Sequence, residues 1–159
     1  MTRKLFASAA VLALLGGSAS AQDLKFAPGE DARFHWDSYE ALKSVDLKGQ
    51  TLTVLGPWLG PDKDLVESVI AYFETATGAT VNYSGSDSFE QQIVIDAGAG
   101  SPPDVAVFPQ PGLAADLAAK GFLRPLGDDT AKWLADSYAA GQSWADLGTY
   151  PGKDGAKAL

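Results

Sequence analysis

Residues 51–84, TLTVLGPWLGPDKDLVESVIAYFETATGATVNYS, predict a strand, a helix and a second strand in succession. Residues 51–55 and 80–84 have the composition of strands. The segment between them carries Asp64 and Glu67 at capping-box spacing, and Gly78 is a stop signal. Its apolar residues fall on one helical stripe: Leu65, Val66, Val69, Ile70 and Phe73. This order of elements is typical of a parallel sheet covered by helices.

The same alternation continues along the chain. Residues 89–98 predict a second helix, with Ser88 and Gln91 at capping-box spacing. Residues 104–108, DVAVF, are almost continuously apolar and predict a third strand that is covered on both faces. Two further helices are expected, at residues 112–121 and 129–140. We therefore expect an α/β fold with a parallel sheet flanked by helices.

The first residues predict a secretory signal peptide over 1–21. Arg3 and Lys4 precede an apolar run over 5–15, and small residues stand at 19–21. The apolar run is shorter than the roughly 20 residues of a membrane-spanning helix. We expect cleavage before Gln22 and a soluble mature protein.

The rest divides into two parts. Residues 22–50 are mixed in character and predict an extension with one short helix, and residues 51–159 predict the α/β lobe. The final stretch, GTYPGKDGAKAL (148–159), is rich in turn residues and shows no closing helix or strand. We therefore expect the sequence to be the amino-terminal part of a longer protein.

The composition excludes several classes of function. The chain has no cysteine, which removes disulfides, thiolate nucleophiles and cysteine metal sites. Its net charge of −8 argues against nucleic acid and anionic lipid as partners. The single histidine, His35, lies before the first strand, so a Ser-His-Asp arrangement is not expected. Asp62 and Asp64 are more typical of a helix start than of a metal site.

Polar side chains follow each of the three predicted strands. Trp58 follows the first strand, Ser86 and Asp87 follow the second, and Gln110 follows the third. Ligands of open α/β sheets bind at the carboxyl ends of the strands, so these residues are expected to share one site. An indole face beside amide and carboxylate groups suits a neutral sugar.

Other interpretations of these residues stay open. One alternative is that the loops have no ligand-binding role, in which case Trp58 covers the end of the core and Gln110 closes a turn. Asp87 and Glu90 are the nearest candidates for a pair of glycosidase carboxylates, although Glu90 also fits a solvated residue of a first helical turn. Trp133 and Trp144 are interpreted as core residues.

Several stretches resemble the extracellular solute-binding proteins of sugar ABC transporters. They are AYFETATGATV (71–81), IVIDAGAGSPPDVAVFPQPG (93–112) and LAAKGFLRPL (117–126). FAPGEDARFHWDSYEAL (26–42) and YAAGQSWADLGTYPGKDG (138–155) are similar to the periplasmic α-glucoside-binding subgroup.

The resemblance implies the amino-terminal lobe of a two-lobed, type II periplasmic binding protein whose carboxyl-terminal lobe is missing from this sequence. It implies a monomeric periplasmic receptor for an α-glucoside such as trehalose, sucrose or maltose, delivering its ligand to an ABC permease. It implies no catalytic residue, metal or cofactor. The ligand-binding positions carried over are Trp58, Gln110, Glu90, Asp87 and Ser86. The alternatives are a secreted carbohydrate-active enzyme and a binding protein for a non-sugar solute such as a polyamine.

Overall fold

The computed structural model describes residues 24–159. The predicted signal peptide, residues 1–21, lies outside the described residues. The centre of the fold is a three-stranded parallel sheet in the order β2-β1-β3. Its strands are β1 (Thr51–Gly56), β2 (Thr80–Gly85) and β3 (Val105–Ala106). The predicted parallel α/β arrangement is therefore confirmed.

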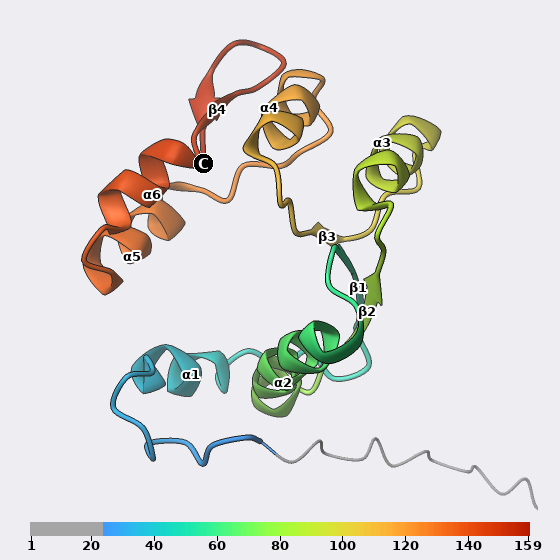
Figure 1. The fold of residues 1–159 in the computed structure, drawn as a ribbon. Helices are drawn as coiled ribbons and strands as arrows, with labels where there is room; N and C mark the ends of the chain where they lie inside the picture. The colour runs from blue at the N-terminus through green and yellow to red at the C-terminus, as the bar shows by residue number, and fades with distance from the viewer. Residues whose placement is uncertain (1–23) are drawn as a thin grey trace, which may run out of the picture.

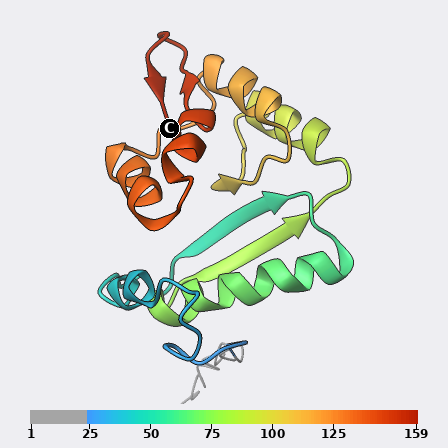
Figure 2. The same cartoon turned by 60° about the vertical axis from the view of Figure 1, so that its left-hand side comes forward.

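Helices cover both sides of this sheet. They are α2 (Gly60–Thr77), α3 (Phe89–Ala99) and α4 (Pro111–Ala119). Figures 1 and 2 show α2 running alongside β1 and β2 on one side, with α3 and α4 on the other. The buried core lies on the second side and joins Leu55 of β1 to Phe89, Ile93 and Leu117. This core fixes the start of α3 against the end of β1.

Helix α2 differs from its prediction in its start and in its buried face. It begins at Gly60, with Pro61 in its first turn, because the fixed φ of proline suits that position. The capping box predicted at Asp64 is therefore wrong. Leu65 and Val69 are exposed, although both belong to the predicted apolar stripe.

Strand β3 is shorter than predicted. Only Val105 and Ala106 pair with β1, opposite Val54 and Leu55. Val105 is exposed, so the expected cover on both faces is not observed. Residues 24–159 supply no strand on the far side of β3, and a strand paired along one edge has fewer ladder hydrogen bonds to extend it.

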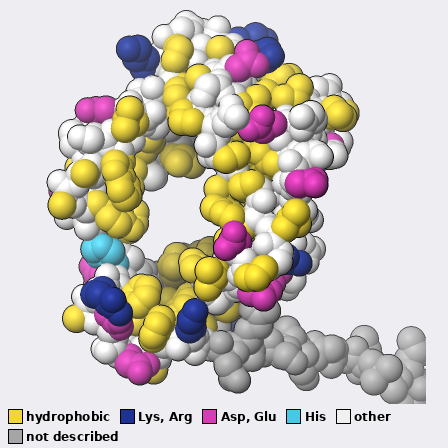
Figure 3. Space-filling model, in the orientation of Figure 1, with side chains coloured by type: hydrophobic (Ala, Val, Ile, Leu, Met, Phe, Trp, Pro, Cys, Tyr) yellow, Lys and Arg dark blue, Asp and Glu magenta, His cyan; other side chains and the backbone are white. Residues whose placement is uncertain are grey.

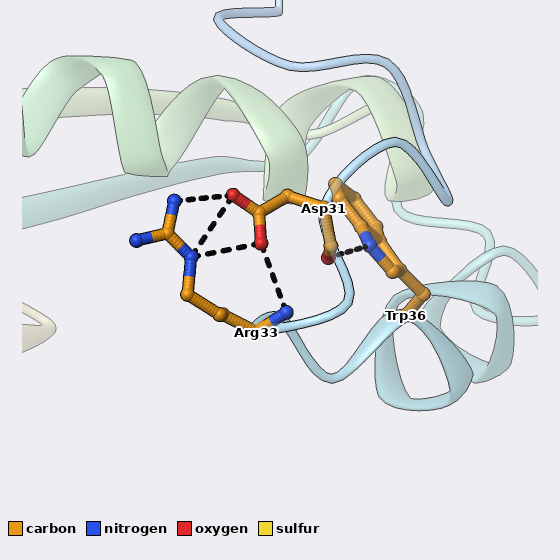
Figure 4. A network of polar contacts seen from close by, with 3 residues as sticks. All are labelled: Asp31, Arg33 and Trp36. Carbon is orange, nitrogen blue, oxygen red and sulfur yellow. Dashed lines mark hydrogen bonds and ion pairs between the residues drawn. The ribbon is translucent and has the colours of Figure 1, made fainter.

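The amino-terminal extension contains the predicted short helix, α1 (Trp36–Leu42). The Arg33 guanidinium donates to the Asp31 carboxylate and holds the pKa of that carboxyl down, at about 2. The Trp36 indole N–H donates to the Asp31 carbonyl at 2.7 Å, so the bonds from Arg33 and from Trp36 in Figure 4 all converge on Asp31. The Tyr72 hydroxyl of α2 bonds the amide and the carbonyl of Phe26, at 2.8 and 2.9 Å, and ties the extension to the lobe.

The carboxyl-terminal segment is more regular than predicted. It contains α5 (Asp128–Ser137), α6 (Gly141–Leu147) and an antiparallel pair, β4 (Tyr150–Pro151) and β5 (Lys157–Ala158). The expectation of no closing helix or strand is therefore wrong. A Cβ at Gly141 would lie 1.7 Å from the Leu134 carbonyl oxygen, so glycine permits the close turn between α5 and α6. Trp133 and Trp144, expected in the core, are both exposed.

Figure 3 shows an open passage near the centre of the molecule with hydrophobic side chains around it. Within residues 24–159, every helix is too short or too polar to cross a bilayer.

Candidate functional site

The loops that follow the three strands meet at one edge of the sheet. They line an open cavity of about 240 Å³. Its lining comes from all three loops and from the first turn of α3: Pro57, Ser86, Asp87, Phe89, Glu90, Gln91 and Pro109. This is the carboxyl edge, where ligands of open α/β sheets bind.

Three of the five residues expected at the site line this cavity: Ser86, Asp87 and Glu90. Trp58 and Gln110 stand next to the lining prolines in the chain but are not part of the lining. Trp58 is half-buried, and Gln110 is exposed at the start of α4. The structure thus brings together the acidic and hydroxyl groups of Ser86, Asp87 and Glu90, whereas Trp58 and Gln110 are linked to the cavity only through the neighbouring prolines.

The loop after β2 is ordered by its own side chains. The Ser88 amide donates to Ser86 Oγ at 3.1 Å, and the Ser88 hydroxyl donates to Asp87 Oδ1 at 3.2 Å. Ser88 is the N-cap residue of α3, but its side chain makes no cap bond, so the capping box expected there does not form. Glu90 lies in the first turn of α3, where the helix dipole favours a carboxylate.

Two features of the site were not anticipated from the sequence. Phe89 was expected only on a helical stripe, but it lies next to the cavity while its side chain is buried in the core. The loop after β1 is held by Tyr83, whose hydroxyl bonds the main chain of Trp58. The sequence signal for Phe89 as a site residue was its position directly after the polar loop 86–88. The sequence around Tyr83 contains no signal that its hydroxyl would bond another loop.

The lining is suited to an uncharged or cationic ligand. It has two carboxylates, an amide and a hydroxyl, and it contains no lysine or arginine. The cavity is smaller than the roughly 300–1,000 Å³ typical of small-molecule sites. Its walls therefore contact only part of a disaccharide-sized ligand.

Other site types find little support in the described residues. His35 lies beside the rings of Trp133 and Tyr138 and is not in the cavity lining. Within residues 24–159, no group of three or more histidine or acidic side chains is arranged to hold a metal ion.

Comparison with known proteins gives one family and two relatives that are all described as binding proteins. The model of the family "Bacterial extracellular solute-binding protein" matches residues 56–153. The α-glucosides-binding periplasmic protein AglE of Rhizobium meliloti is 61% identical over 166 aligned positions, covering all of this chain and 36% of the relative. The osmoprotective compounds-binding protein GgtB of Synechocystis is 40% identical over 102 positions, covering 64% of this chain and 24% of the relative. The chain thus spans little more than a third of the length of the first of these relatives.

Proposed function

The chain belongs to the family of bacterial extracellular solute-binding proteins, and we propose that it supplies one wall of the sugar site of a periplasmic receptor for α-glucosides. The receptor would deliver its ligand to the permease of an ABC transporter, as a monomer and without catalysis. The observation that carries the proposal is the cavity at the carboxyl edge of the sheet, where Ser86, Asp87 and Glu90 come together.

The chemistry of the lining supports a polyhydroxylated ligand. Sugar hydroxyls both donate and accept hydrogen bonds, and carboxylate and amide groups match them in pairs. Pro57 and Pro109 offer apolar surface for the C–H faces of a pyranose. The name of the R. meliloti relative, which is 61% identical, supports an α-glucoside in particular.

The small size of the cavity supports a site shared between two lobes. We propose that residues 51–159 form one lobe, that residues 22–50 are an extension packed on it, and that a second lobe covers the ligand. Closure of two lobes around a ligand is a common way to exclude water from such a site.

The test is a chimera in which residues 22–159 replace the corresponding part of the R. meliloti relative. Calorimetric titration with trehalose, sucrose, maltose and spermidine is expected to show saturation by an α-glucoside. We propose that the Trp58 indole, next in the chain to the lining Pro57, contacts the bound sugar. Trp58→Ala is then expected to weaken binding by roughly tenfold or more, because a lost aromatic contact commonly costs above 1 kcal/mol. Trp144→Ala, which removes an exposed indole that is not in the cavity lining, is the control and is expected to bind as the parent does.

Saturation by spermidine alone, or unchanged affinity in Trp58→Ala, would contradict the proposal. A hydrolytic enzyme is the second candidate, because Asp87 and Glu90 line the same cavity. Glucose released from the disaccharides on long incubation, and abolished by Glu90→Gln, would establish hydrolysis and overturn a pure binding role.

A further inference from the structure

The main chain of Trp58 is fastened to the neighbouring strand by one buried side chain. The Trp58 amide donates to the Tyr83 hydroxyl at 3.1 Å, and that hydroxyl donates to the Trp58 carbonyl at 3.2 Å. Tyr83 belongs to β2 and is buried, opposite Val54 of β1. Its hydroxyl therefore reaches past the end of β1 into the loop that supplies Pro57 to the cavity wall.

Two glycines make room for this contact. Gly56 and Gly85 face each other at the ends of β1 and β2. A Cβ at Gly85 would lie 2.0 Å from the Trp58 carbonyl oxygen, and a Cβ at Gly56 would lie 2.7 Å from the Tyr83 hydroxyl. Neither glycine has a positive φ, so space and not backbone conformation requires them.

From this geometry we infer that Tyr83 is a positioning residue of the candidate site. It sets the path of residues 57–59, and with it the place of the Pro57 wall and the Trp58 indole. The inference rests on the proposed function only in naming the ligand, because the fastening itself is a property of the unliganded chain.

The chain contains a matched control. Tyr72 makes the same pair of bonds, from one hydroxyl to the amide and carbonyl of one residue, but its target is Phe26 in the extension. The Tyr72 ring lies 6.0 Å from the Trp36 ring. Removing either hydroxyl should therefore disturb a different tryptophan.

The experiment labels the four tryptophans of the 159-residue chain with 5-fluorotryptophan and records ¹⁹F NMR spectra without ligand. Trp58→Phe and Trp36→Phe assign the two resonances. Tyr83→Phe is expected to shift or broaden the Trp58 resonance and leave Trp36 in place. Tyr72→Phe is expected to do the reverse. Loss of stability alone would not select one resonance in each variant.

A folded Tyr83→Phe variant with an unchanged Trp58 resonance would overturn the inference. If that variant does not fold, amide exchange in the wild-type chain decides the question. Exchange of the Trp58 amide slowed at least tenfold would support the bond to Tyr83, and exchange at the rate of an unprotected amide would overturn it.

The ligand arm separates this inference from the proposed function. In the chimera, Tyr83→Phe is expected to weaken α-glucoside binding by roughly threefold to tenfold, because both hydrogen bonds that hold the Trp58 main chain are lost while no ligand contact is removed. A chimera that binds no sugar would overturn the proposed function, and the ¹⁹F result would still decide the role of Tyr83.

Discussion

Replacement of Phe89 by alanine is expected to lower the free energy of unfolding by about 3–5 kcal/mol. Phe89 is 2% exposed and packs in the cluster with Leu55, Ile93 and Leu117. Its ring also meets Phe108 edge-on, with centroids 5.5 Å apart and planes at 84°. Such a ring pair accounts for about 0.5–1.5 kcal/mol of the expected loss, and the cavity left in the core accounts for most of the rest.

The assay is urea unfolding followed by tryptophan fluorescence. For a slope near 2 kcal/mol per M, the expected loss lowers the midpoint by roughly 2 M. Phe122→Ala removes the same side chain from an exposed position and is the control. Its expected change is within about 1 kcal/mol.

Two results would refute this reasoning. One is a Phe89→Ala midpoint within roughly 0.5 M of the parent, because such a shift corresponds to only about 1 kcal/mol. The other is an equal shift in Phe122→Ala. Either result would mean that the packing of α3 against the end of β1 does not stabilise the fold as described.

Two further predictions concern stability. The Thr53 amide and hydroxyl donate to Asp104 and hold the pKa of that carboxyl below its ordinary value. The stability that these bonds contribute is present above the unfolded pKa near 4 and is lost as the pH falls through the lower folded pKa. Between about pH 5 and pH 2, the melting temperature should therefore fall more steeply in the parent than in Asp104→Asn. If the melting temperatures of the parent and of Asp104→Asn fell in parallel with pH, this prediction would be wrong. Gly141→Ala should lower the melting temperature by about 4 °C or more, because the added Cβ would meet the Leu134 carbonyl. Gly112→Ala, which has open space around the added Cβ, is the control and should leave the melting temperature unchanged. Equal melting temperatures of the two variants in calorimetry would contradict the close turn between α5 and α6.

The elements set by local pattern were predictable from the sequence. Strands β1 and β2 alternate or run apolar between turn residues, and both were found within one residue of their predicted ends. The start of α2 was missed because Pro61 in the first turn outweighed the capping-box spacing that begins three residues later at Asp64. The length of β3 was missed because pairing depends on a neighbouring strand, which is not a local property.

The candidate site divides in the same way. The rule that ligands bind at the carboxyl edge was enough to select Ser86 and Asp87, which line the cavity, whereas Glu90 was selected from the family resemblance and as a carboxylate near Asp87. The role of Tyr83 was not predictable, because the reach of its hydroxyl across to the next loop depends on the register of β1 and β2. Whether the five predicted residues bind a ligand stays a prediction.

The Tyr83 hydroxyl bonds the amide and the carbonyl of residue 58, so these hydrogen bonds do not involve the side chain at that position. A library of variants at this one position would therefore present many different surfaces on a loop of constant path. Single substitutions at residue 58 could therefore change the ligand preference of the site while the rest of the fold stays as it is.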